Sequence, residues 1–166
     1  SWRPRPCARC RTVCTWGGRR AVSGVGSGLG WAQSVVGAGS GYATAVLSRI
    51  AQTVVAEESV EGLAAVASEG IEALGITNVV IEQGELMSAA AEHGPFDIVL
   101  FGGALAQVPE RLADFLEEGG RAIAVMSEAG EGYGAATLFT KYGGHLGEVS
   151  VFDAAIPALP EFDVPK

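Results

Sequence analysis

A short run of glycines at residues 37–41 constrains this chain more than any other feature. Its sequence, Gly-Ala-Gly-Ser-Gly, follows an apolar segment at 34–36 and precedes a helical pattern that ends at Ile50. Glycine permits a sharp backbone turn and leaves no Cβ between the backbone and a ligand. A glycine loop between a strand and a helix is typical of a ligand site at the carboxyl edge of a parallel sheet.

Beyond this loop, short apolar segments alternate with helical patterns. We predict strands at 34–36, 53–56, 78–81, 96–101 and 121–126, and helices at 42–50, 60–74 and from Pro109 to 118. A final pair of strands is expected at 135–141 and 149–153, separated by a turn at Gly143-Gly144. This alternation predicts an α/β fold with a doubly wound, mostly parallel sheet.

Composition divides the chain into two parts. Residues 1–33 show neither helical nor strand periodicity, whereas 34–166 carry the predicted elements, so we expect an irregular basic segment followed by one domain. The first 20 residues hold six arginines and no acid, which leaves five basic and 19 acidic residues, a net charge of −14, in 21–166. Such a negative body disfavours nucleic acid and anionic membranes as partners.

All three cysteines, Cys7, Cys10 and Cys14, lie in the N-terminal segment. A disulfide framework for the core is therefore excluded, which is consistent with a cytoplasmic protein. The cysteines lack a fourth zinc ligand nearby, and we predict no metal site. His93 precedes Gly94-Pro95 and His145 follows two glycines, so both are expected in surface loops.

The spacing of the glycines indicates which ligand the loop accepts. A dinucleotide fingerprint, G-x-G-x-x-G, would place its third glycine at position 42, which is Tyr42 here. A bulky ring where helix and strand pack closely disfavours NAD. The observed G-x-G-x-G spacing is associated with S-adenosylmethionine, whose amino acid end carries no phosphate.

Acidic residues follow the next two predicted strands. Glu57 lies 20 residues after Gly37 and is a candidate acceptor for both ribose hydroxyls, a feature that NAD and S-adenosylmethionine sites share. Glu58 should point the other way, because side chains alternate along a strand; the pair could instead be a solvated strand end. Glu85, which follows Gly84, is either an acceptor for the adenine amino group or an ordinary loop acid.

Several blocks of sequence, taken together, match one known family. They are Val36 to Tyr42, Ala45 to Leu47, Val54 to Glu57, Leu74 to Val79, Gly84-Glu85, Gly94 to Val99, Val108 to Glu110 and Leu116 to Arg121. Over about four-fifths of its length the chain resembles the protein-L-isoaspartate O-methyltransferase family. The glycine loop alone is common among methyltransferases, whereas its combination with Pro-Phe-Asp and with a Leu-x-x-Gly-Gly-Arg turn is more specific.

The resemblance implies a function and a fold. Members transfer a methyl group from S-adenosylmethionine to the free carboxylate of isoaspartyl residues in damaged proteins. The fold expected is the Rossmann-like methyltransferase sheet, mostly parallel with an antiparallel C-terminal strand. The predicted cofactor-binding residues are Gly37, Gly39, Ser40, Gly41, Tyr42, Glu57 and Glu85.

The chain also departs from the family pattern. The family has a serine-containing loop, G-x-T-I-S-x-P, upstream of the glycine loop, and nothing in 1–33 matches it. Val35 and Glu85 stand where an acid and an Asp are usual. We therefore assign no catalytic residue. Two alternatives stay open: a non-catalytic module that binds the cofactor or only retains the fold, and a nicotinamide oxidoreductase, which Tyr42 disfavours.

Overall fold

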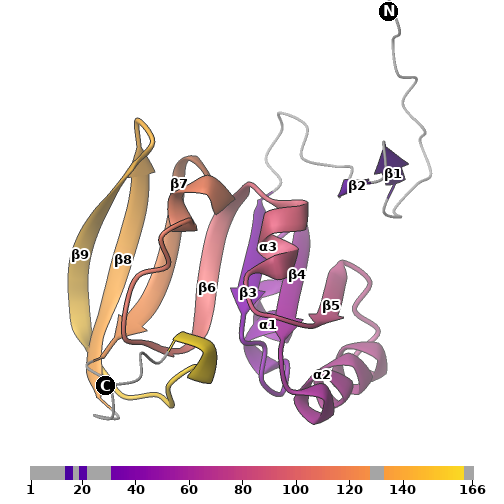
Figure 1. The fold of residues 1–166 in the computed structure, drawn as a ribbon. Coiled ribbons are helices and arrows are strands. Elements are labelled where there is room, and N and C mark those ends of the chain that lie inside the picture. Colours follow the sequence, from indigo (N-terminus) through magenta and orange to yellow (C-terminus); the bar gives the residue numbers. More distant parts are fainter. Residues whose placement is uncertain (1–13, 17–18, 22–30, 128–132, 163–166) are drawn as a thin grey trace, which may run out of the picture.

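A seven-stranded sheet forms the centre of the molecule, with the order β5-β4-β3-β6-β7-β8-β9 (Figure 1). The computed structural model describes residues 14–16, 19–21, 31–127 and 133–162. The strands of this sheet are β3 (Ala32–Val36), β4 (Thr53–Glu58), β5 (Val79–Gln83), β6 (Phe96–Leu105), β7 (Leu116–Met126), β8 (Gly134–Tyr142) and β9 (His145–Ala154). Strands β3 to β7 pair in parallel, and β8 pairs antiparallel with both β7 and β9.

The helices lie on both faces of the parallel strands. These are α1 (Tyr42–Leu47), α2 (Glu61–Ala73) and α3 (Ser88–His93), with short 3₁₀ turns η1 (Leu112–Phe115) and η2 (Pro160–Phe162). Leu47 of α1 packs with Val54, whereas Ala90 of α3 belongs to the cluster that contains Val55, on the opposite face of β4. The sheet grows in one direction from β3 through β4 to β5, and the chain then crosses back to β6 on the other side of β3. Because crossovers between parallel strands are right-handed, this reversal places α3 on the opposite face from α1 and α2.

The predicted doubly wound, mostly parallel sheet with an antiparallel C-terminal part is confirmed. The antiparallel strand is β8, however, and not the last one. Because β9 pairs antiparallel with β8, it runs in the same direction as β7. The Gly143-Gly144 turn that joins β8 to β9 has φ values of 57° and 80°, in the left-handed region where glycine is favoured.

Two helical predictions differ from the structure. No helix was expected at Ser88–His93, where α3 forms, and the segment after Pro109 makes only the 3₁₀ turn η1. Leu112 and Phe115 are the two buried residues of η1, and their spacing of three suits the three residues per turn of a 3₁₀ helix. The predicted helix does not continue beyond this turn, because strand β7 begins at Leu116.

Helix α2 lies close to its predicted range of 60–74. Its buried residues are Ala64, Ala67 and Ile71, whereas Leu63 and Leu74 are 40% and 59% exposed. Small alanines allow the helix to lie close to the sheet. Gly75 has φ of 64°, as expected for a glycine that ends a helix.

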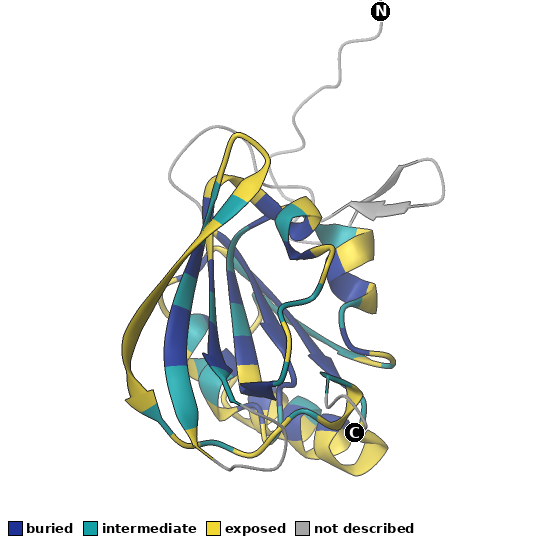
Figure 2. Cartoon of the chain, turned by 60° about the vertical axis from the view of Figure 1, so that its left-hand side comes forward, coloured by how far each residue is buried: buried dark blue, intermediate teal, exposed yellow. Residues whose placement is uncertain are grey.

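Burial falls steeply from the centre of the sheet to its C-terminal edge. All five residues of β3 are buried, whereas β9 is exposed along almost its whole length (Figure 2). The main apolar cluster includes Phe96, Phe139 and Leu116, on the face that carries α3. The core therefore lies under the parallel strands and extends outward only as far as β8.

Little of the N-terminal segment is described. Two short strands, β1 (Cys14–Trp16) and β2 (Arg19–Ala21), pair antiparallel there, although we expected no regular structure. Cys7 and Cys10 lie outside the described residues. Strand β3 begins at Ala32, two residues before the domain start that we predicted.

Among the described residues, no helix is both long enough and apolar enough to cross a membrane.

Candidate functional site

The glycine loop turns back over the end of β4. The φ angles of Gly37, Gly39 and Gly41 are 81°, 55° and 80°, values that residues with a side chain rarely adopt. The N–H groups of Gly37 and Ala38 both donate to the carbonyl of Glu57, at 2.9 and 2.8 Å. These bonds fix the loop at the carboxyl edge of the sheet, where ligands of open α/β sheets bind.

The three glycines have different surroundings. A Cβ on Gly41 would lie 3.0 Å from the Cβ of Ala67 in α2, so this glycine allows loop and helix to approach closely. A Cβ on Gly39 would meet no atom within 4 Å. The backbone at Gly39 is therefore open to a ligand, whereas Gly41 serves packing.

Glu58 is the acid that contacts this loop. Its Oε2 accepts a 2.7 Å hydrogen bond from the N–H of Gly39, and its Oε1 accepts one of 3.0 Å from Val60, the residue before α2. The residue is only 5% exposed. The end of β4 thus presents a carboxylate beside the most open part of the glycine loop.

Glu57 lies on the other face of the sheet, under α3. It is 1% exposed, and its Oε1 accepts a 2.8 Å hydrogen bond from the N–H of Ala90. Burial raises the pKa of this carboxyl, backbone hydrogen bonds such as that from Ala90 lower it, and the neighbouring charge of Glu82 adds a smaller increase; together they bring the pKa to about 7. Within the described part of the chain Glu57 Oε2 has no hydrogen-bond partner.

The predicted orientations of these two acids are therefore reversed. We expected Glu57 to face the glycine loop and Glu58 to point away, and the alternation itself is correct. Strand β4 is buried on both faces, so its side chains carry no apolar–polar pattern that would assign one acid to a face. The pairing of Glu57 with Val36 and Glu82 fixes its direction toward α3.

The other predicted residues lie at the same edge. Ser40 and Tyr42 are exposed at the start of α1, with Tyr42 77% exposed. Glu85 follows β5 and is exposed; its backbone carbonyl accepts a 2.6 Å hydrogen bond from the hydroxyl of Ser88. The structure thus places Gly37, Gly39, Gly41 and Glu58 in contact with one another or in one loop, while the cofactor-binding role of each residue stays a prediction.

His93 was expected in a surface loop, and this prediction is wrong. It is the last residue of α3, its side chain is 3% exposed, and its Nε2 lies 2.8 Å from Oε1 of Glu82 on β5. The carboxylate oxygens of Glu82 and Glu92 and the imidazole nitrogen of His93, which are atoms of the kind that coordinate metal ions, lie within 4.8 Å of one another. The hydrogen bond with Glu82 ties the end of α3 to the sheet and holds the His93 side chain in this buried position.

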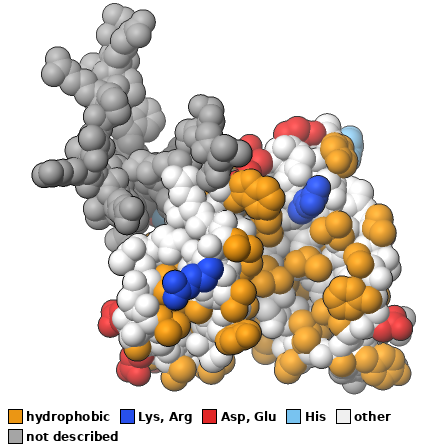
Figure 3. All heavy atoms as spheres, turned by 180° about the vertical axis from the view of Figure 1, so that it is seen from behind, with side chains coloured by type: hydrophobic (Ala, Val, Ile, Leu, Met, Phe, Trp, Pro, Cys, Tyr) orange, Lys and Arg blue, Asp and Glu red, His pale blue; other side chains and the backbone are white. Residues whose placement is uncertain are grey.

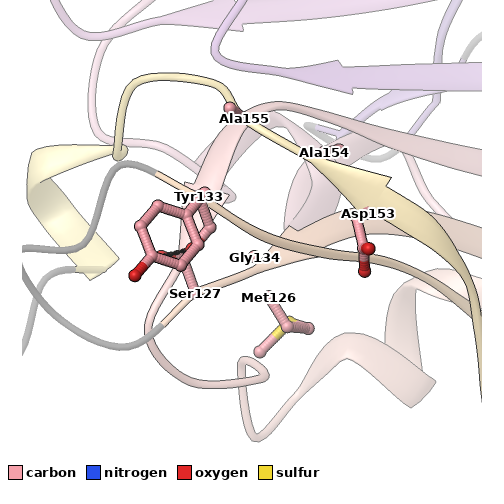
Figure 4. Close-up of a pocket in the computed structure, with 7 residues that line it drawn as sticks. All are labelled: Met126, Ser127, Tyr133, Gly134, Asp153, Ala154 and Ala155. Atoms are coloured by element: carbon pink, nitrogen blue, oxygen red, sulfur yellow. Dashed lines mark hydrogen bonds between the residues drawn. The ribbon is translucent and has the colours of Figure 1, made fainter.

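A separate pocket of about 630 Å³ lies beside the ends of β7 and β9 (Figure 4). Met126, Ser127, Tyr133, Gly134, Asp153, Ala154 and Ala155 line it. None of them belongs to the predicted site.

Comparison with known proteins gives a consistent result. A model of the family "Protein-L-isoaspartate(D-aspartate) O-methyltransferase (PCMT)" matches residues 25–149. Protein-L-isoaspartate O-methyltransferase 2 of Syntrophobacter fumaroxidans is 39% identical over 107 residues, which cover 64% of this chain and 39% of the relative. The enzyme of the same name from Pelobacter propionicus is 41% identical over 60% of this chain and 39% of its own length. The chain therefore spans about two fifths of these relatives.

A solved structure agrees with this result. A protein-L-isoaspartate O-methyltransferase described from Plasmodium falciparum, in complex with S-adenosyl-L-homocysteine, superposes with a TM-score of 0.70 at 26% identity. The superposition covers 80% of this chain and 67% of that one. The likeness therefore includes most of the sheet on which the glycine loop and Glu58 lie.

Proposed function

Since the chain belongs to the protein-L-isoaspartate(D-aspartate) O-methyltransferase family, we propose that it binds S-adenosylmethionine and methylates isoaspartyl carboxylates in damaged proteins. The family match over residues 25–149 is the observation on which this proposal rests, because it contains the glycine loop and both acids. With its cysteines confined to the first 14 residues, the protein is proposed to act in the cytoplasm.

The residues at the loop fit such a cofactor. The open backbone at Gly39 gives room for an approaching ligand, and the adjacent Glu58 carboxylate is an acceptor of the kind that binds ribose hydroxyls. We propose Glu58, in place of Glu57, for this contact. Glu85 remains the proposed acceptor for the adenine amino group, with Gly37, Ser40, Gly41 and Tyr42 forming the rest of the loop.

The reaction demands little acid–base chemistry from the protein. The nucleophile is a carboxylate that is already ionised, and S-adenosylmethionine supplies an activated methyl group and a neutral thioether leaving group. The protein must hold carboxylate oxygen, methyl carbon and sulfur in line, with an attack distance of ~3 Å. Positioning and exclusion of water therefore replace a catalytic base, and for this reason no catalytic residue is proposed.

The cofactor contact is tested by calorimetric titration with S-adenosylhomocysteine. Glu58→Gln removes the charged acceptor beside Gly39 and should weaken binding by at least about ten-fold, since a charge-assisted hydrogen bond contributes about 1.5–3 kcal/mol. Glu117→Gln, on an exposed position of β7, is the matched control and should bind as the wild type does. If Glu57→Gln weakens binding and Glu58→Gln does not, the assignment of the two acids is wrong.

The activity is tested by methyl transfer to an isoaspartyl peptide, with the same peptide containing ordinary aspartate as control. Transfer to the isoaspartyl peptide alone is expected. A module that binds the cofactor without turnover is the second candidate, because residues 1–33 do not match the serine-containing loop that the family carries upstream of the glycine loop. Binding of S-adenosylhomocysteine without transfer would establish that candidate in place of the enzyme.

A further inference from the structure

Residues 156–162, which we call the C-terminal strap, fold back from β9 onto the end of β6. The N–H of Ala104 donates to the carbonyl of Pro157 at 2.8 Å, and the N–H of Leu159 donates to the carbonyl of Ala104 at 2.9 Å. Ala104 and Ala158 form a parallel bridge. These bonds hold the strap at the carboxyl edge of the sheet, where Figure 1 shows it in yellow below β6.

The strap places an apolar side chain on the glycine loop. A Cβ on Gly37 would lie 2.7 Å from Cδ2 of Leu159, and a Cβ on Gly103 would lie 2.7 Å from its Cγ. The Leu159 side chain therefore lies directly against the backbone of both glycines. These are the positions where an absent Cβ would otherwise leave the backbone accessible to a ligand.

The strap also carries an acid to the end of β5. Oε2 of Glu161 accepts a 2.9 Å hydrogen bond from the N–H of Leu86, the residue after Glu85. An adenine edge offers an acceptor ring nitrogen beside a donor amino group. A backbone N–H can donate to the ring nitrogen while a neighbouring carboxylate accepts from the amino group. Glu161 therefore occupies the Leu86 N–H, which is the donor of this pair. Phe162 anchors the strap through an edge-to-face contact with Phe101, with ring centres 6.1 Å apart.

We propose that the C-terminal strap is an internal occupant of the cofactor cleft, with Leu159 over the glycine loop and Glu161 on the Leu86 N–H, and that it withdraws when the cofactor binds. This inference rests on the proposed cofactor binding. Only molecules with the strap withdrawn bind the cofactor. The apparent Kd is therefore the intrinsic Kd divided by the fraction of molecules in that state. The cleft is then a two-state element whose closed state is built from this chain's own residues.

The test compares the affinity for S-adenosylhomocysteine of the wild type and of strap variants. Leu159→Ala combined with Glu161→Ala should bind at least about five-fold more tightly, because the closed state loses both contacts. Glu161→Gln alone, which leaves the apolar packing intact, should bind more tightly by a smaller factor. Glu148→Gln with Val149→Ala, on the exposed part of β9, is the control and should bind as the wild type does. Circular dichroism verifies that each variant is folded.

Hydrogen exchange gives a second readout that does not depend on turnover. Saturating S-adenosylhomocysteine should speed exchange of the Ala104 and Leu159 amides in the wild type, since both donate in the strapped state. Slower exchange there, or equal or weaker binding by the folded strap variants, would overturn the strap as a competitor while leaving cofactor binding in place. A lack of binding by the wild type and by every folded variant would instead refute the proposed function, and the inference with it.

Discussion

The two ends of the sheet are built differently, and the difference locates the site. The inner half, strands β3 to β6 with α1 to α3, is covered by helices on both faces, and every residue of β3 is buried. The outer hairpin, β8 and β9, has exposed Val149, Val151 and Phe152 on its last strand. Seen from behind, hydrophobic side chains are visible at many places on the surface (Figure 3). Parallel strands need crossovers that cover them, whereas a hairpin is satisfied by local pairing.

This comparison shows why the acids of the site lie where they do. A carboxylate can be held almost completely buried only where helix N–H groups or loop N–H groups can reach it, as Ala90 reaches Glu57 and Gly39 reaches Glu58. The outer hairpin carries its acids, such as Glu148, on exposed positions. The inner half is therefore expected to respond to substitution and to pH much more strongly than the outer hairpin.

The largest expected contrast is between two phenylalanines. Phe96→Ala in the inner half, where the side chain is 1% exposed, should lower the free energy of unfolding by about 3–5 kcal/mol, because it leaves a cavity. Phe152→Ala in the outer hairpin, where it is 59% exposed, should lower it by less than about 1 kcal/mol. Urea denaturation measures both. Similar losses for the two variants would show that the outer hairpin is buried in solution and would break the comparison.

The next contrast is a pH effect that belongs to Glu57. Its pKa is raised from 4.5 to about 7, so the folded protein holds the proton more tightly than the unfolded chain does. The stability that the protonated carboxyl contributes is complete below pH 4.5 and is lost as the pH rises to about 7, by roughly 3 kcal/mol at most.

Glu57→Gln imitates the protonated form and should remove this loss, so that the variant is more stable than the wild type at pH 8. Urea denaturation at pH 5 and pH 8 measures the difference, with Glu148→Gln on β9 as the control that should retain the wild-type difference. An unchanged pH dependence in Glu57→Gln would mean that this carboxyl is solvated, contrary to the burial described above.

The smallest contrast separates two glycines with the same φ of 80°, Gly41 and Gly144. Gly144→Ala in the outer hairpin meets no atom within 4 Å, and only the backbone conformation should cost about 1 kcal/mol. Gly41→Ala adds contacts of 3.0 Å and 3.1 Å with Ala67, so its cost should be about 2 kcal/mol or more. Thermal denaturation measures both, and equal costs would show that α2 moves away from the loop without loss.

The sequence predicted most of the inner half correctly. The strands at 53–56, 78–81 and 96–101 lie within or overlap the observed β4, β5 and β6, because short apolar runs and the punctuating glycines are local signals. Helix α3 was missed because its short alanine-rich sequence forms a helix mainly through its packing on β4. The hairpin strands were found but were predicted too short.

What the sequence determined alone is the loop and its chemistry: glycines at 37, 39 and 41 allow backbone angles that other residues avoid, and two acids lie at the end of the next strand. Only the tertiary structure decided which acid faces the loop, since a strand buried on both faces carries no polar pattern. The same holds for Leu159 and Glu161, whose contacts with Gly37 and Leu86 span more than 70 positions. Such contacts depend on where the ends of β6 and β9 meet in space, and no local periodicity encodes them.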